Sequence, residues 1–531
     1  MEKNLVVVSN LDNPELLLHS VPCLRAIQKT HTDAEICLVI SEHSEELCEI
    51  LPAGFTIHCV ENADTANVDA ISKPSVYYQL GSSEQSLALS AKIKGETNVG
   101  AHYISGELRL ENDWDAYIAQ LQTSTQYNPF HRVELLRNSA NQIGIESDFE
   151  LVAPTDLQIG ISKYFQGEHI KLGIALDGQN PEELRAAIQS ILQLDLRLKI
   201  YLLGTVKDRR LSNTLMESIA SPSRVVELTG RLGLGQTAAF AQACDIVIAV
   251  PGLFTTMAAG FGTFCIALDS TQGESCINYP YGHGHLIVQR NHAALSTTEF
   301  GDLIADLVAH AVLGAEGNIP NQANWENYFD GRVDSILGKV RVFITQRVQE
   351  ALSDGSTRTD LKLHPLLFTG ATSNDCLRSF YRLLWEQTLS GYNISTHEVD
   401  ILEEQTLGTL TTLLTPMEQL CELTLFGQKY TSMVAANIAS GELDTAKLNS
   451  NRLQELDDLI GVFANTHPYL APICQYLFIR HGQSRAATVP EIASELAAAY
   501  RGAQLQVLIL LDLYKSLFQN TYDQETRSLH G

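Results

Sequence analysis

The sequence lacks several features that would place it in other classes of protein. None of its 10 cysteines forms a C-x-x-C pair, so we expect no structural zinc site and reduced thiols in the core. No stretch approaches the roughly 20 apolar residues that a membrane-spanning helix needs. Residues 1–18 lack the apolar segment and the small-residue cleavage site of a signal peptide. We therefore expect a cytoplasmic protein without an integral membrane segment.

Basic residues are also scarce. The chain has 36 Lys and Arg against 62 Asp and Glu, and its formal net charge is −26. Such a charge repels polyanions, so we expect no nucleic-acid partner and no docking on anionic lipid. Apolar residues make up 45% of the sequence without a dominant low-complexity tract, which excludes a mostly disordered or fibrous chain. At 531 residues the chain is too long for one core, so we expect two or three domains.

Short apolar runs alternate with helical periodicity over the first 155 residues. The runs at 4–8, 36–40, 55–60 and 74–80 are apolar throughout, which is typical of parallel strands covered on both faces. This pattern predicts one doubly wound α/β domain over residues 1–155.

The same alternation restarts after residue 155. Apolar runs lie at 169–176, 197–204, 223–230, 245–250 and 263–269, and residues 331–352 have the pattern of a long amphipathic helix. The pattern predicts a second Rossmann-like domain over residues 156–352. Two such domains in tandem enclose a cleft, which is a common place for a ligand.

The remaining sequence has a different character. Residues 353–360 (SDGSTRTD) have the composition of a linker. Nearly every long segment beyond them has helical periodicity, so we expect an all-α domain over residues 361–531. Its long apolar stripes are a candidate surface for homo-oligomer formation. The alternative is a self-contained helical bundle.

The order of these segments resembles glycosyltransferase family nine, the ADP-heptose:lipopolysaccharide heptosyltransferase type, over roughly residues 4–350. The similarity is carried by YYQLGSSEQSLALSAKIKGETNVG (77–100), by VVELTGRLGLGQTAAFAQACDIVIAVPGLFTTMAAGFGTFCIALDS (225–270) and by YPYGHGH (279–285). The resemblance implies a GT-B fold, here followed by the all-α domain. It also implies that the first domain binds the acceptor and the second binds a nucleotide-sugar donor, without a cofactor or a metal.

Inverting glycosyl transfer needs a carboxylate that takes the proton of the acceptor hydroxyl. Backbone amides, helix N-termini and basic side chains stabilise the departing diphosphate in GT-B enzymes. Asp12 and Glu15 follow the first strand, at the edge of a parallel sheet where ligands usually lie, and are the candidate catalytic residues. Their alternative role is to cap the following helix.

Two groups of residues are candidates for donor binding. Glycine-containing turns bring backbone amides close to phosphate, and hydroxyl or guanidinium groups add hydrogen bonds. The alternative for each group is a purely structural turn or helix cap. The candidates are Gly204, Thr229, Gly230, Arg231, Gly252, Thr255 and Thr256, and the turn 233–238 (GLGQTA) opens the helix after Arg231.

The chain departs from the family at its functional positions. The family's D-S-G triplet falls on Pro251, Gly252 and Leu253, its histidine falls on Thr256, and its first-domain acidic residue falls near Leu16. Two functions therefore stay open. One is a metal-independent glycosyltransferase with a soluble acceptor, a protein among the candidates. The other is a catalytically degenerate GT-B protein that acts as a binding or scaffold module.

Two further motifs are expected to be coincidental. His283 and His285 supply too few ligands for a metal site. The segment LFIRHGQS (477–484) contains the R-H-G signature of histidine phosphatases, whose histidine accepts a phosphoryl group. That motif is followed by a whole α/β domain in the phosphatases, whereas here the chain soon ends in helical segments.

Overall fold

The computed structural model describes most of the chain. The described residues are 4–71, 73–121, 125–142, 148–165, 167, 169–194, 197–219, 222–269, 277–290, 294–313, 321–330, 339–351, 357–367, 372–391, 406–484 and 488–528. The chain forms two compact units. The α/β unit comprises residues 1–108 and 130–369, and the helical unit comprises residues 109–129 and 370–531.

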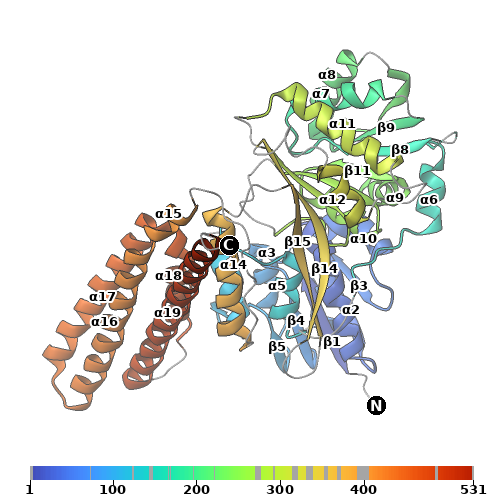
Figure 1. Ribbon diagram of the computed structural model, residues 1–531. Coiled ribbons are helices and arrows are strands. Elements are labelled where there is room, and N and C mark those ends of the chain that lie inside the picture. Colours follow the sequence, from blue (N-terminus) through green and yellow to red (C-terminus); the bar gives the residue numbers. More distant parts are fainter. Residues whose placement is uncertain are drawn as a thin grey trace. The chain divides into compact units, whose positions relative to one another are not determined.

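The first lobe of the α/β unit is a five-stranded parallel sheet in the order β3-β2-β1-β4-β5 (Figure 1). Its central strands are buried on both faces, as the continuous apolar runs predict. The strands are β1 (Leu5–Asn10), β2 (Glu35–Ser41), β3 (Thr56–Val60), β4 (Val76–Gln79) and β5 (Thr97–Val99). The helical elements of this lobe are α1 (Pro14–His19), α2 (Val21–Thr30), η1 (Glu42–Ile50), η2 (Asp69–Ile71), α3 (Glu84–Ser90) and α5 (Arg132–Ser139), and a small hairpin pairs β6 (His102–Ile104) with β7 (Glu107–Arg109).

The second lobe contains an eight-stranded sheet in the order β10-β9-β8-β11-β12-β13-β14-β15. The strands up to β13 are parallel, and β14 and β15 form an antiparallel hairpin at the edge. The strands are β8 (Ile170–Ala175), β9 (Leu198–Leu203), β10 (Val225–Glu227), β11 (Ile246–Ala249), β12 (Phe264–Asp269), β13 (Leu286–Arg290), β14 (Val340–Ala351) and β15 (Thr357–Leu367). Its helical elements are α6 (Thr155–Ser162), α7 (Pro181–Gln193), η3 (Val206–Asp208), α8 (Arg209–Ser218), η4 (Pro222–Arg224), α9 (Leu234–Ala243), α10 (Leu253–Gly260), α11 (Thr297–Leu313) and α12 (Gln322–Asp330).

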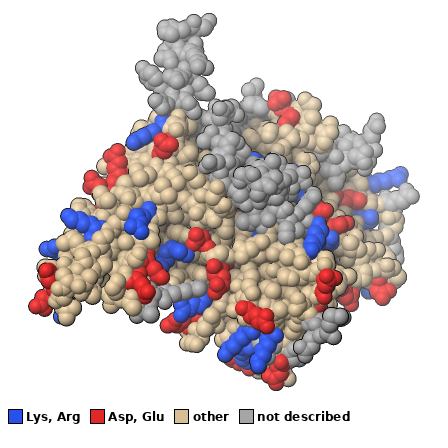
Figure 2. All heavy atoms as spheres, turned by 90° about the horizontal axis from the view of Figure 1, so that it is seen from below, with Lys and Arg blue, Asp and Glu red and all other residues tan. Residues whose placement is uncertain are grey.

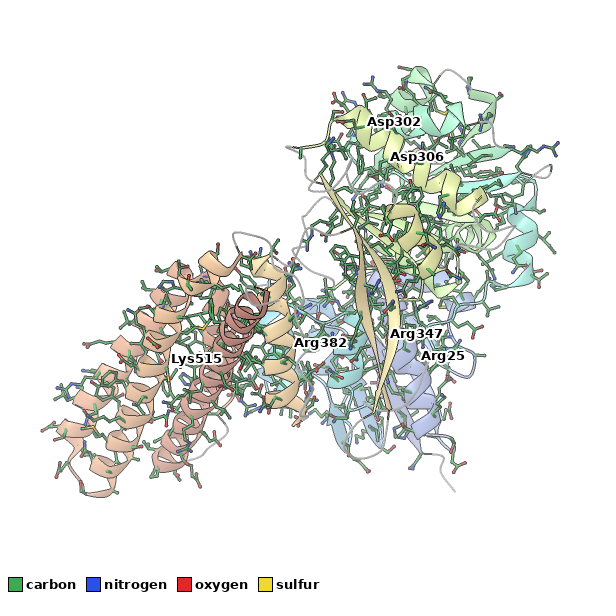
Figure 3. All side chains as sticks on the ribbon, in the orientation of Figure 1. Arg25, Asp302, Asp306, Arg347, Arg382 and Lys515 are labelled. Atoms are coloured by element: carbon green, nitrogen blue, oxygen red, sulfur yellow. The ribbon has the colours of Figure 1, made fainter. Side chains whose placement is uncertain are left out.

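The two lobes share one hydrophobic core. Leu17 and Leu47 of the first lobe belong to the same buried cluster as Phe240 and Met257 of the second. The connection between the lobes is held by two arginines: Arg25 on α2 donates to the carbonyl of Glu150 at 2.8 Å, and Arg347 on β14 pairs with Asp148 at 2.9 Å (Figure 3).

The long helix expected over residues 331–352 is wrong where the structure describes it. Residues 340–351 form strand β14, which pairs with β13 on one side and β15 on the other. The strand is buried on both faces over part of its length, since Val342, Phe343, Ile344 and Thr345 are all buried. The expected linker 353–360 is also incorrect in part, because β15 begins at Thr357. Residues 352–356 lie outside the described part of the chain.

The helical unit confirms the all-α character of the C-terminal part, although its first helix begins only at residue 373. The helical elements are α14 (Ser373–Trp385), η5 (Glu386–Ser390), α15 (Thr406–Thr411), α16 (Leu414–Ala439), α17 (Leu443–Thr466), η6 (Pro468–Leu470), α18 (Ala471–Gly482) and α19 (Val489–Ser528). An earlier helix, α4 (Asp113–Leu121), belongs to the same unit. Tyr117 of α4 contacts Trp385 with ring centroids 5.1 Å apart, and Arg382 donates to the carbonyl of Pro129 (Figure 3).

Helix α19 has the length and the apolar composition of a membrane-spanning helix. Among the described residues, its segment Val489–Phe518 is long and apolar enough to cross a membrane by length and composition alone. The same helix packs along α16 and α18, with Val507, Leu510 and Tyr514 buried inside the unit. A core helix of a soluble bundle has the same properties, so the absence of a membrane segment stays a prediction.

Candidate functional site

Both sheets of the α/β unit have a point where the strand order reverses. In the first lobe this point lies between β1 and β4, and in the second lobe it lies between β8 and β11. Doubly wound sheets bind ligands at the carboxyl ends of such strands. A ligand is therefore expected near the residues that follow β1, β8 and β11.

Asp12 follows β1, and its carboxylate is hydrogen-bonded to other residues of the first lobe. Its carboxylate accepts hydrogen bonds from the amides of Ser82 (2.8 Å) and Ser83 (2.9 Å) and from Oγ of Ser86 (2.7 Å). The side chain is buried. Asp12 does not cap α1, because Asn13 does so by accepting from the amide of Leu16 at 3.0 Å. These contacts give Asp12 a structural role at the start of α3, and its catalytic role stays a prediction.

Removal of this carboxylate is expected to destabilise the protein. We expect Asp12→Ala to lower the free energy of unfolding by about 3 kcal/mol, because it leaves buried donors without their charged acceptor. The matched variant Asn13→Ala removes only a helix cap, which costs about 1 kcal/mol. Thermal unfolding measures both changes. Equal shifts of the melting temperature in the two variants would contradict the structural role of Asp12.

Glu15 lies in the first turn of α1, at the meeting of the two reversal points. Its Oε2 is 3.9 Å from the position that a Cβ atom would take at Gly252, the residue that precedes α10. Its Oε1 is buried and makes no hydrogen bond with the described residues. Burial raises the pKa of the Glu15 carboxyl, the positive charge of Arg132 opposes this increase, and Asp177 after β8 adds to it.

Arg132 is a site residue that the sequence did not single out. It is the first residue of α5, and its Nε is buried without a hydrogen-bond partner among the described residues. Burial lowers the pKa of Arg132, and the carboxylates of Glu15 and Asp12 counteract this decrease. Buried polar atoms normally find a partner. The free atoms of Glu15 and Arg132 therefore mark a place where a ligand or water would form hydrogen bonds.

The start of α10 is a closed cap. The amide of Gly252 donates to Oγ1 of Thr255 at 3.0 Å, and Oγ1 of Thr256 lies 2.9 Å from the carbonyl of Gly252. Both threonines are buried. Their hydroxyl groups make hydrogen bonds at the helix start, and donor binding by Thr255 and Thr256 stays a prediction. The first-turn amides that follow Gly252 have no partner within the helix, as at any helix start.

The other donor-binding candidates gather at the carboxyl ends of β9 and β10. The amide of Gly230 donates to the carbonyl of Gly204 at 2.8 Å, and Gly230 has a φ of 64°, which favours glycine. Thr229 is buried, and its Oγ1 has no partner among the described residues. Arg231 is exposed and pairs with Glu227 at 2.7 Å. Strand β9 is adjacent to β8, so this group lies about one or two strand spacings, roughly 5–10 Å, from the end of β8.

The glycine-rich turn before α9 is occupied by a side chain of the first lobe. Oε2 of Glu46 on η1 accepts the amide of Gly235 at 3.0 Å, and a Cβ atom at Gly233 would lie 2.4 Å from the same oxygen. The amides at a helix N-terminus attract anions. Here that anion is a carboxylate of the chain itself, so a phosphate at turn 233–238 would have to replace the Glu46 side chain.

Two buried histidines connect the lobes behind Glu15. Nε2 of His19 lies 3.1 Å from Oγ1 of Thr256, and the His19 ring meets the ring of His131 edge to face at 5.1 Å. Nε2 of His131 donates to the carbonyl of Tyr279 at 2.8 Å, which leaves Nδ1 to accept the amide of Val133. Burial lowers the pKa of His131 to about 3 and that of His19 well below its usual value. Both rings are therefore neutral, and His19 joins α1 to α10 through Thr256 while His131 joins the start of α5 to Tyr279.

The two coincidental motifs have structural explanations. His285 is buried and its Nδ1 accepts the amide of Cys265 at 3.3 Å. Within the described part of the chain, no group of three or more His, Cys, Asp or Glu side chains is placed to hold a metal ion. The R-H-G segment forms the last turn of α18, where His481 packs against Tyr500 with ring centroids 4.7 Å apart.

Comparison with known proteins gives structural matches alone. No family model and no curated protein matches the sequence. The glycosyl transferase family 9 from Veillonella parvula is 17% identical, with 54% of this chain and 86% of that chain covered and a TM-score of 0.44. E. coli ADP-heptose lps heptosyltransferase II is 14% identical, with 57% and 97% covered and a TM-score of 0.44. E. coli heptosyltransferase WaaC with ADP is 14% identical, with 58% and 98% covered and a TM-score of 0.39. These proteins carry the family names that the sequence segments resemble.

Proposed function

We propose that this chain is a glycosyltransferase that moves a sugar from a nucleotide-sugar donor to a soluble acceptor, with inversion and without a metal. The observation that carries the proposal is the Glu15 carboxyl. It follows β1, its Oε2 lies 3.9 Å from the position of a Cβ atom at Gly252 after β11, its Oε1 is buried without a hydrogen-bond partner among the described residues, and its pKa is raised. Perturbed carboxyls at such positions are candidates for proton transfer.

In the proposed reaction, Glu15 accepts the proton of the acceptor hydroxyl. The hydroxyl oxygen forms a bond with the anomeric carbon as the bond between that carbon and the diphosphate oxygen breaks. The nucleoside diphosphate leaves with the bonding electrons. Arg132 and the first-turn amides of α10 offset the charge on this leaving group. Thr229, Gly230 and Arg231 lie farther along the sheet edge, where the nucleoside would extend.

The acceptor and the location of the protein follow from charge. A net charge of −26 disfavours an anionic membrane surface, so the proposal takes a soluble acceptor, a protein among the candidates, in the cytoplasm. On the face shown in Figure 2, Lys and Arg side chains are interspersed with Asp and Glu side chains rather than gathered in one basic surface. The described side chains on that face thus form no continuous basic surface of the kind that binds nucleic acid.

Self-association through the helical unit is part of the same proposal. Leu448, Leu459 and Val462 of α17 are exposed. They are separated by 11 and 14 residues along the helix, so they share one face. An exposed apolar stripe of this kind is typical of an interface between protein chains.

A second function, that of a binding or scaffold module without transfer activity, is favoured by Glu46. Its carboxylate occupies the α9 turn in place of a ligand anion. The hydroxyl groups of Thr255 and Thr256 are buried, which also favours a module without transfer activity.

Calorimetry with a panel of nucleotide sugars distinguishes the two functions. The transferase is expected to bind at least one donor and to hydrolyse it slowly when no acceptor is present. Release of nucleoside diphosphate gives the hydrolysis rate. Absence of both binding and hydrolysis would exclude the transferase and leave the binding module.

A further inference from the structure

The helical unit contains a cavity that the proposed reaction does not use. Its volume is about 670 Å³. It is open to solvent and is lined by the segment before α4 together with η5, α18 and α19, and all of its described lining residues belong to the helical unit. A cavity of this size is within the range of small-molecule and side-chain binding sites.

The space exists because α19 presents small residues to it. Ala498, Ala499 and Gly502 line one wall. A Cβ atom added at Gly502 would meet no heavy atom within 4 Å. Leu505 and Ile509 continue this wall with apolar surface. The wall therefore suits an aliphatic chain.

The opposite side of the cavity is polar and negatively charged. Glu111, Asp113 and Glu495 line it together with one cation, Arg480, which pairs with Asp113 at 2.7 Å. Among the described lining residues, three carboxylates thus outnumber one guanidinium. Gln506 also lines the cavity, is only 3% exposed, and its Oε1 has no hydrogen-bond partner among the described residues. Negative charge and an unused acceptor both favour a ligand that donates hydrogen bonds.

We propose that this cavity binds an ammonium or guanidinium group carried on a short aliphatic chain. Such a group has donors only, so it donates to the Gln506 oxygen and is attracted by the excess of negative charge, while its carbon chain lies against the α19 wall. The group belongs either to a free amine or to a Lys or Arg side chain of a peptide. This inference does not rest on the proposed transferase, because no nucleotide sugar takes part in it.

The test uses two neutral variants of the full chain. Gly502→Leu fills the cavity, and Gly461→Leu places the same side chain on α17, where a Cβ atom also meets nothing within 4 Å. Both substitutions replace a helical glycine by a better helix former, and circular dichroism confirms that each variant is folded. Neither changes the net charge, so general attraction of cations to an acidic protein is the same in both.

Calorimetry at 0.15 M salt, where surface attraction is screened, measures binding of cadaverine, of the capped peptide Ala-Lys-Ala and of its norleucine analogue. We expect Gly502→Leu to weaken binding of the amine at least about tenfold and Gly461→Leu to change it less than about twofold. Binding of cadaverine alone assigns the site to a free amine, and binding of the lysine peptide alone assigns it to a protein partner. The proposal is overturned if no amine binds, if the norleucine peptide binds equally well, or if Gly502→Leu binds like the unmodified chain.

Discussion

Glutamine in place of Glu15 is expected to lower sugar transfer by about 100-fold or more and to change donor affinity by less than about threefold. Glutamine keeps the size of the side chain but cannot accept the acceptor proton. Burial raises the pKa of Glu15, so the unmodified protein is expected to gain activity as the pH rises through that pKa. Steady-state rates as a function of pH measure both effects, and the variant should lack this pH-dependent limb.

The matched control is Glu84→Gln. Glu84 lies in the first turn of α3, just as Glu15 lies in the first turn of α1, but it is exposed. The control should transfer sugar at the unmodified rate. Full turnover by Glu15→Gln would exclude Glu15 as the base, even if calorimetry showed that the protein binds a donor. Loss of activity in both variants would indicate a general effect of helix charge rather than proton transfer.

The local sequence pattern was sufficient to predict most of the α/β architecture. Strands β1, β2, β8 and β11 are largely buried on both faces. Their sequences are therefore mostly apolar, and this pattern predicts a parallel sheet. The β14–β15 hairpin does not follow from the local pattern, because the mixed apolar and charged residues of 340–351 also suit an amphipathic helix and the start of β15 has the composition of a linker. Helix α4 has an ordinary amphipathic pattern, and nothing in it indicates that it packs with α14 instead of the neighbouring sheet.

The site was predicted less completely because its contacts join distant parts of the chain. Glu15 was identified from its place after β1, but the partners of Asp12 lie some 70 residues away on the start of α3. Arg132 reaches the site only through the position of α5. Glu46 and Gly235 are 189 residues apart. A single sequence shows that a glycine turn exists, whereas only the fold shows which anion occupies it.

Acidification is expected to destabilise the α/β unit through its buried histidines. Burial lowers the pKa of His131 to about 3 and that of His285 to about 4, and it lowers the pKa of His19 as well. The unfolded chain therefore binds more protons than the folded chain below the usual histidine pKa of about 6.5. Stability is complete above that pH and falls as the pH drops toward the folded values, by roughly 1.4 kcal/mol per pH unit and histidine.

The slope of stability against pH isolates this effect. Between pH 6.5 and 4.5 each histidine should account for about 2–3 kcal/mol. Asparagine at position 131 keeps an N-cap acceptor for α5 but does not titrate, so His131→Asn should flatten the slope even if its stability at pH 7 is lower. His43→Asn, at an exposed position, should leave the slope unchanged. Chemical unfolding at several pH values gives the slopes, and identical slopes for the two variants would show that His131 is already protonated or accessible in the folded chain.

The raised pKa of Glu15 has the opposite effect on stability. Protonation of that buried carboxyl stabilises the fold as the pH falls. Replacement of Glu15 by Gln removes this gain, so the free energy of unfolding should fall more steeply on acidification.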